Sequence, residues 1–125
     1  MTLKDFESCL QRADQRETEH LPWGRLEWSA SARIGNSETM TIGTCFIEPG
    51  MQNGRHFHPN CDEVLRVVRG VIVQTLDDFQ CEMNVGDVVC IPSGVVHHAR
   101  NIGDETAELA ISFSSAHRET IDVDG

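Results

Sequence analysis

From residue 24 onward, hydrophobic and polar side chains alternate along most of the chain. Alternation with a period of two places successive side chains on opposite faces of an extended strand. Short segments of this kind, bounded by glycine, proline, asparagine and aspartate, occur at residues 26–34, 40–48, 63–69, 71–76, 80–85, 88–91, 96–101 and 105–112. Many short strands joined by regular turns predict an all-β sandwich or barrel.

The first part of the chain follows a different period. Apolar residues recur at helical spacing on one stripe, at positions Leu3, Phe6, Leu10 and Ala13. Thr2 can cap the helix, and Asp5 stands three residues later as its capping-box partner. We therefore expect a surface helix over residues 2–18, ended by the Leu-Pro-Trp-Gly sequence at residues 21–24.

These patterns divide the chain into three parts. Residues 1–23 are expected to form an N-terminal helix and linker, and residues 24–114 a β-barrel. Residues 115–125 are polar and are expected to be a loose tail. A length of 125 residues suits one domain with one core.

The net charge of −10 argues against nucleic-acid binding, which requires clustered lysine and arginine, and against binding to an anionic membrane surface. No stretch approaches the ~20 apolar residues of a membrane span. The five cysteines are odd in number, and the N-terminal residues are polar and charged, unlike a secretory signal. We expect a soluble, cytoplasmic protein with reduced thiols.

Two stretches carry candidate metal ligands. His56 and His58 are two residues apart, so on an extended strand both imidazoles point to the same face. Glu63 and His97 can complete the set if the fold brings their strands alongside. Three imidazoles and one carboxylate suit one divalent transition metal, namely Fe, Mn, Ni, Zn, Co or Cu. An octahedral ion would keep two open positions, as catalytic rather than structural sites do.

The spacing of these residues resembles the two signature motifs of the cupin family. The first motif runs from Gly50 to Gly70 and the second from Gly86 to Asn101, and every defined position of the family pattern is matched. The resemblance covers roughly residues 24–113. It implies a double-stranded β-helix, or jelly-roll barrel, that binds a metal through His56, His58, Glu63 and His97.

Side-chain parity predicts a substrate pocket beside the ligands. Leu65 and Val67 share the face of Glu63, and Ala99 shares that of His97. The family pattern turns Gln74 inward, where its amide either orients a substrate or water, or meets a backbone group. Two neighbours are less suited to a role in the site. His98 turns to the outer face and could act as an acid or base only if the strand bulges. Cys61 lies in a loop near the mouth, where its thiol either meets substrate or oxidant or, as we favour, is an unreactive small side chain.

The site favours an enzyme that acts on a small molecule, with dioxygenase-type chemistry. The predicted lining is apolar and suits an aromatic or otherwise uncharged substrate, and no inward cluster of lysine or arginine is evident. The alternatives are a metal-dependent isomerase or lyase and a non-catalytic module that binds a small ligand. The chain has no tyrosine, so Glu63 is the candidate acid or base, provided that it swings off the metal.

The N-terminal helix and the segment at residues 23–28 add apolar surface beyond what one small barrel needs. Small cupins often pair through their N-terminal strands, so the resemblance also implies a homodimer.

Overall fold

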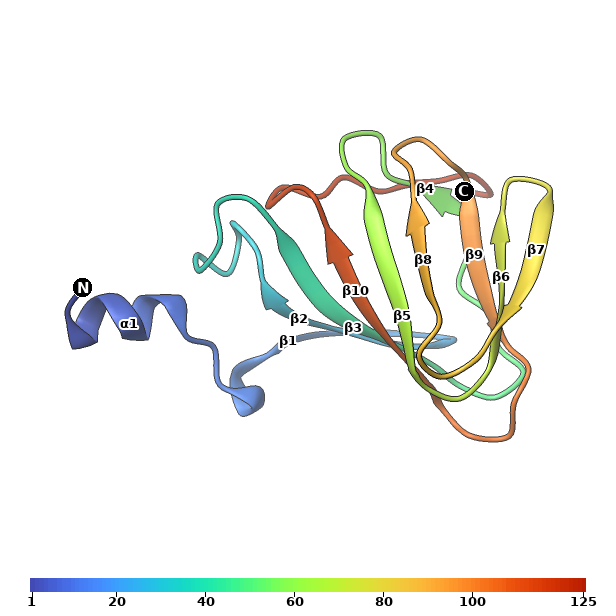
Figure 1. The fold of residues 1–125 in the computed structure, drawn as a ribbon, viewed down its shortest axis with the longest axis horizontal. Coiled ribbons are helices and arrows are strands. Elements are labelled where there is room, and N and C mark those ends of the chain that lie inside the picture. Colours follow the sequence, from blue (N-terminus) through green and yellow to red (C-terminus); the bar gives the residue numbers. More distant parts are fainter.

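Two antiparallel sheets face each other in the computed structural model, which describes residues 1–125 (Figure 1). The first sheet contains, in spatial order, β1 (Glu17–Leu21), β2 (Gly24–Ala30), β3 (Thr41–Ile47), β10 (Ala107–Phe113), β5 (Glu63–Arg69) and β8 (Val88–Ile91). The second contains β11 (Ile121–Asp122), β4 (His56–Phe57), β9 (His97–Asn101), β6 (Ile72–Leu76) and β7 (Phe79–Met83). The prediction of an all-β jelly roll with an N-terminal helix is confirmed.

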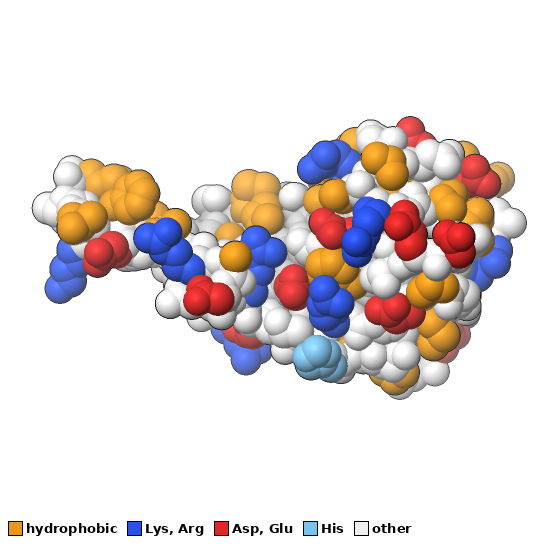
Figure 2. Space-filling model, turned by 90° about the horizontal axis from the view of Figure 1, so that it is seen from below, with side chains coloured by type: hydrophobic (Ala, Val, Ile, Leu, Met, Phe, Trp, Pro, Cys, Tyr) orange, Lys and Arg blue, Asp and Glu red, His pale blue; other side chains and the backbone are white.

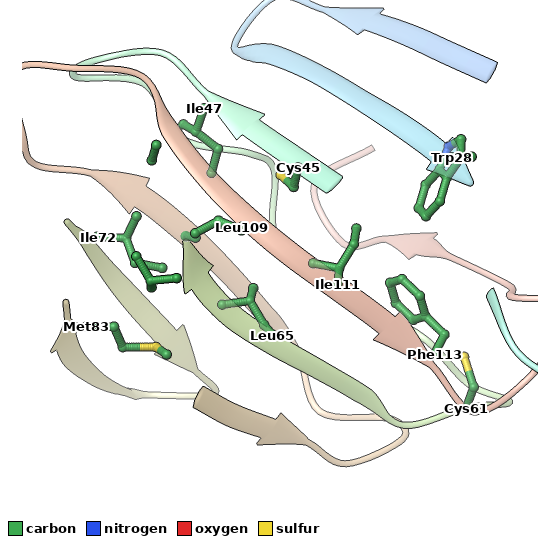
Figure 3. Packing of buried hydrophobic residues seen from close by; sticks show 13 residues of the cluster. Trp28, Cys45, Ile47, Cys61, Leu65, Ile72, Met83, Leu109, Ile111 and Phe113 are labelled. Carbon is green, nitrogen blue, oxygen red and sulfur yellow. The ribbon is translucent and has the colours of Figure 1, made fainter. Parts of the chain in front are cut away.

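The alternating pattern determines which side chains fill the space between the sheets. On β5, Leu65 and Val67 are buried whereas Val64 and Arg66 are exposed, as their parity predicts. The core side chains in Figure 3 come from both sheets and include Ile47, Leu65, Ile72, Met83, Leu109, Ile111 and Phe113. Trp28 closes one end of this core, where its ring lies 6.1 Å from that of Phe113.

Two turns require unusual backbone. Asp77 has a φ of 52° in the tight β6–β7 hairpin, a conformation that Asp adopts more readily than most residues. At Gly24, which begins β2, any side chain would collide with the carbonyl group of Phe46 on the neighbouring strand. Glycine at this position therefore allows β2 and β3 to pair closely.

The predicted helix over residues 2–18 is wrong beyond its first turns. The helix α1 spans Leu3–Cys9, a short 3-10 turn follows at Ala13–Gln15, and the next residues form β1, paired with β2 in a hairpin. Along β1 the polar side chains are largely exposed, so the strand is defined by backbone hydrogen bonds and leaves little periodic signal. With seven residues, α1 is too short to traverse a lipid bilayer.

The strand expected over residues 26–34 ends earlier, at Ala30. The side chain of Asn36 folds back over the following turn: its Nδ2 donates to the carbonyl of Ser29, and its Oδ1 accepts from the N–H of Ser31. The hydroxyl of Ser31 accepts from the N–H of Ile34. These local bonds divert the backbone from the ladder, and the alternation of Ala30, Ala32 and Ile34 does not reveal them.

The C-terminal residues are not the loose tail that their composition predicted. The segment crosses the top of the molecule and returns to β4, with β11 pairing Ile121 to Phe57 and Asp122 to His56 (Figure 1). Before that strand, the carbonyl of Ala116 accepts from the N–H of Ala32. The tail is therefore part of the folded body, and it lies beside two of the candidate ligands.

Candidate metal centre

The four candidate ligands come from separate parts of the sequence and meet between the two sheets. His56 begins β4 and His58 follows that strand, Glu63 begins β5, and His97 begins β9. The pairing of β4 with β9 sets His56 directly opposite His97. One potential ligand atom from each of the four residues lies within 4.8 Å of the others. The fold thus brings together all four residues that the sequence singled out.

Backbone carbonyl groups fix the orientation of all three imidazoles. The Nδ1 atoms of His56, His58 and His97 lie 2.7, 2.9 and 2.9 Å from the carbonyl oxygens of Gly54, Glu119 and Val95, respectively. A carbonyl oxygen only accepts, so each Nδ1 is the protonated donor. Each Nε2 therefore has its lone pair available for a cation, the arrangement typical of metal-binding histidines.

The Nε2 atoms of His58 and His97 face the carboxylate of Glu63, and with both Nδ1 atoms protonated neither Nε2 has a hydrogen to donate to it. Nε2 of His97 lies 3.1 Å and Nε2 of His58 lies 3.3 Å from Oε1 of Glu63. Nε2 of His58 is buried and has no hydrogen-bond partner. In the neutral tautomers just assigned, lone pairs point at a carboxylate oxygen, which is repulsive unless a cation lies between them. The donor set therefore fits a divalent metal, held by His56, His58, Glu63 and His97.

The ionisation of Glu63 and His56 agrees with that assignment, whereas at His97 a proton competes with a metal ion for Nε2. Burial favours a raised pKa for Glu63, but contacts with His58 and His97 outweigh it and hold the pKa at about 2. Burial lowers the pKa of His56 to about 4, so this ring is neutral at pH 7. Burial also opposes charge on His97, but the carboxylate of Glu63 overcomes it and raises the pKa of that ring. A carboxylate and a neutral imidazole are the forms that bind metal ions.

The four residues lie on the wall of a cavity of about 570 Å³, within the range of small-molecule sites. Its apolar side is formed mainly by the first sheet and includes Leu26, Trp28, Leu65, Ile111 and Phe113. The ring of Phe113 also packs edge-on against His58, with 4.9 Å between the centroids. A ligand bound at the metal would therefore have apolar side chains along its body.

The residues predicted to form the pocket divide into two groups. Leu65, Gln74 and Ala99 line the cavity. Val67 is fully buried within the hydrophobic core, outside the lining of the cavity. The amide of Gln74 is buried as well, and its Oε1 has no hydrogen-bond partner. The substrate contacts of these four residues and the catalytic role of Glu63 stay predictions.

Cys61 and His98 take no place in the cavity wall. Cys61 is buried in the core cluster, and burial raises the pKa of its thiol, as expected for an unreactive side chain. His98 is half-buried on the opposite face of β9 from His97. The outward face of His98 agrees with the prediction, whereas Cys61 lies in the buried core instead of at the mouth of the cavity.

The sequence did not point to the tail residues that enter the site. Arg118 and Thr120 line the cavity, and the hydroxyl of Thr120 lies 3.2 Å from Nδ1 of His58. The sequence showed no inward cluster of lysine or arginine, yet two arginines, Arg55 and Arg118, line the cavity. Neither Arg118 nor Thr120 belongs to the two ligand motifs, and the polar composition of residues 115–125 gave no signal that they return to the barrel.

Comparison with known proteins agrees with this fold. The family model described as "Cupin domain" matches residues 43–113. Protein SchB of Streptomyces halstedii is 34% identical over 68 residues, which are 54% of this chain and 49% of SchB. "Polyketide synthase CurC" of Streptomyces cyaneus is 30% identical over 73 residues, 58% of this chain and 47% of CurC. The chain thus spans about half the length of these relatives.

Among solved structures, the S161A mutant of Bacillus subtilis oxalate decarboxylase OxdC superposes with a TM-score of 0.81. The match covers 90% of this chain and 31% of that one, at 24% sequence identity, and it establishes a shared fold. The chain belongs to the cupin domain family.

Proposed function

We propose that this cupin is a metal-dependent enzyme that acts on a small, oxygen-bearing organic molecule, with oxygenase-type chemistry. One observation carries the proposal: three Nε2 lone pairs and the carboxylate of Glu63 converge on one point at the wall of a largely apolar cavity. A structural metal site would be closed by its own ligands, whereas this set borders space large enough for a substrate.

A divalent metal at this point would supply a Lewis acid and, if redox-active, a site for oxygen chemistry. The chain's residues supply the rest. The backbone carbonyl groups of Gly54, Val95 and Glu119 hold the imidazoles in one orientation. Leu65, Ile111 and Phe113 exclude water from one side and fit a flat or otherwise apolar substrate body.

Glu63 is the candidate for proton transfer within the site. Because its pKa lies at about 2, its side chain is a carboxylate at neutral pH and accepts a proton rather than donating one. It is also a proposed ligand, so the two roles compete. Proton transfer would require Glu63 to loosen its contact with the metal while the three histidines hold it.

The substrate class follows from the shape and chemistry of the cavity. Two oxygen atoms on one molecule, as in a catechol or a 1,3-dicarbonyl compound, would suit a divalent ion held by only four protein ligands. The name of one relative, polyketide synthase CurC, supports this class, since polyketides are rich in 1,3-dicarbonyl and phenolic groups. An aromatic body would lie against Trp28 and Phe113.

The test begins with metal content. Protein purified without added metal is analysed for bound ions, and metal-free protein is then reloaded under argon with Fe(II), Mn(II) or Zn(II). Oxygen uptake is measured with catechols and 1,3-diketones. We expect uptake with a redox-active ion, and loss of both metal and uptake in His97→Ala. His98→Ala is the matched control, because His98 lies on the outer face of the same strand.

Other outcomes would favour the alternative functions. Turnover under argon with Zn(II) would indicate an isomerase or lyase that uses the metal only as a Lewis acid. Ligand binding without turnover by any metal form would indicate a binding module. A protein that retains no metal at neutral pH would contradict the proposal altogether.

A further inference from the structure

Arg118 is a half-buried cation on the wall of the same cavity. Its Cζ atom lies 4.3 Å from the ring centroid of Trp28 and 5.2 Å from that of Phe113. A guanidinium that stacks on aromatic rings keeps its N–H groups in its own plane, free to bind an oxyanion through two parallel hydrogen bonds. The contacts with the two rings therefore hold the charged group at a defined place on the cavity wall.

Most of the donors on Arg118 have no protein acceptor. Nη1 donates to the hydroxyl of Thr120 at 2.7 Å, and the guanidinium makes no other hydrogen bond and no ion pair with a carboxylate. The other arginine of the cavity, Arg55, is already paired, because it donates to both carboxylate oxygens of Asp124 at 3.0 and 2.7 Å. Arg118 is thus the cavity cation that lacks an anionic partner.

A cation in this position is costly without an anion nearby. Burial lowers the pKa of Arg118, and the carboxylates of Glu63 and Glu19 act in the opposite direction without contacting it. When a metal ion binds, the charge of Glu63 is offset by the ion, so its influence on Arg118 weakens. The guanidinium then faces the cavity with donors that suit an anionic ligand.

We propose that Arg118 is a specificity-determining residue that binds the carboxylate of a small aromatic acid whose other end carries oxygen donors for the metal. The inference rests on the proposed function in one respect, since it requires the cavity to bind a small molecule. A single planar guanidinium matches a carboxylate, and the neighbouring side chains of Leu26, Leu65 and Ile111 provide apolar surface for the ring. The acid thus has one polar end at Arg118 and the other at the three histidines.

The test compares the binding of a carboxylic acid with that of its uncharged amide analogue. Binding of 3,4-dihydroxyphenylacetate and of 3,4-dihydroxyphenylacetamide to the Zn(II)-loaded protein is measured by calorimetry, because a redox-silent ion prevents turnover. Wild type is expected to prefer the acid. In Arg118→Gln, affinity for the acid should fall roughly 10- to 100-fold, as for loss of charge-assisted hydrogen bonds, whereas affinity for the amide should change little.

Two further variants separate recognition from folding. Arg118→Lys keeps the charge but loses the planar fork, so it should recover part of the preference for the acid even if Arg118→Gln folds poorly. Arg66→Gln removes an exposed arginine of β5 and should leave both affinities unchanged. The Zn(II) content and thermal midpoint of each variant show whether the site itself is intact.

Three results would overturn the inference: a wild type that does not bind the acid, a wild type that binds acid and amide equally, or an Arg118→Gln variant that keeps the full preference. Failure of the proposed enzymatic function would give a different result from failure of the anion site. Arg118-dependent binding of the acid with no turnover of any substrate would contradict the enzyme and leave the anion site standing. Turnover with an unchanged ratio of affinities would contradict the anion site alone.

Discussion

The two ends of the chain differ in how much regular secondary structure they contain and in how firmly they pack against the barrel. The N-terminal helix α1 has a capping box between Thr2 and Asp5, yet none of its residues is buried and it projects from the body (Figure 1). The C-terminal segment has only a two-residue strand, yet it pairs with β4, contacts His58 and stacks Arg118 on Trp28. Regular local structure and attachment to the fold are therefore separate properties.

The apolar surface differs in the same way. Leu3 and Phe6 are 74% and 55% exposed, and hydrophobic side chains gather on the projecting arm in Figure 2. The tail exposes little of comparable size apart from Ile121 and Val123, and it buries Ala116 against the body. The arm is thus free to change without disturbing the metal centre, whereas the tail is not.

Deleting either end of the chain should give the largest difference in metal affinity between the two ends. Deleting residues 118–125 removes the carbonyl of Glu119 that holds Nδ1 of His58, along with the Thr120 hydroxyl. Loss of such supporting contacts lowers metal affinity by roughly 10- to 100-fold, which competition with a chelator can measure. Deleting residues 1–10 should leave metal affinity unchanged. Equal effects of the two deletions would contradict the comparison.

Part of the ligand set was readable from side-chain parity, whereas Glu63 and His97 were assigned through the resemblance to the cupin motifs. His56 and His58 share a face on any extended strand, and the burial of Leu65 and Val67 followed from their spacing to Glu63. The helix start was equally readable, because Thr2 and Asp5 interact across a single turn. Each of these features depends on residues a few positions apart.

The features that escaped prediction depend on distant partners. Strand β1 is mostly polar and exposed, so only its pairing with β2 marks it as a strand. Arg118 contacts Trp28, which lies 90 positions earlier in the sequence (118 − 28 = 90). Neither the periodicity nor the composition of residues 115–125 predicts that contact. Packing between segments that are distant in sequence determines these features, so the local sequence pattern could not predict them.

Metal removal should distinguish the two ends in a second way. Without an ion, lone pairs of His58 and His97 face the carboxylate of Glu63, so the contacts that bind the tail to His58 are weakened. We expect faster hydrogen exchange at residues 117–123 in the metal-free protein, measured by mass spectrometry. Exchange in α1 should be fast in both forms. A tail that stays equally protected without metal would contradict the coupling.

The homodimer predicted from the sequence stays a prediction, and the arm offers a direct test of it. Phe6→Asp places a charge in the exposed apolar stripe of α1 and should change the free energy of unfolding of the monomer by no more than about 0.5 kcal/mol. If two copies associate through this stripe, sedimentation equilibrium will show the variant as a monomer and the wild type as a dimer. A monomeric wild type at micromolar concentration would refute the dimer.

The smallest effect is expected at the capping box. Hydrogen bonds from the backbone and side chain of Thr2 hold the pKa of Asp5 below its ordinary value. The contribution of this box to the helix is therefore present at neutral pH and is lost as the pH falls through the lowered pKa. Thr2→Ala should reduce the helical NMR signals of residues 3–9 and leave the thermal midpoint of the barrel unchanged.

The course of the C-terminal segment also bears on how the protein is handled. Gly125 lies at the rim of the metal cavity, whereas Met1 lies at the far end of the projecting arm (Figure 1). A purification tag or fluorescent label attached after Gly125 would emerge at the entrance used by ligands, and a histidine tag there would compete for the same ions. Fusions joined at Met1 keep that entrance clear.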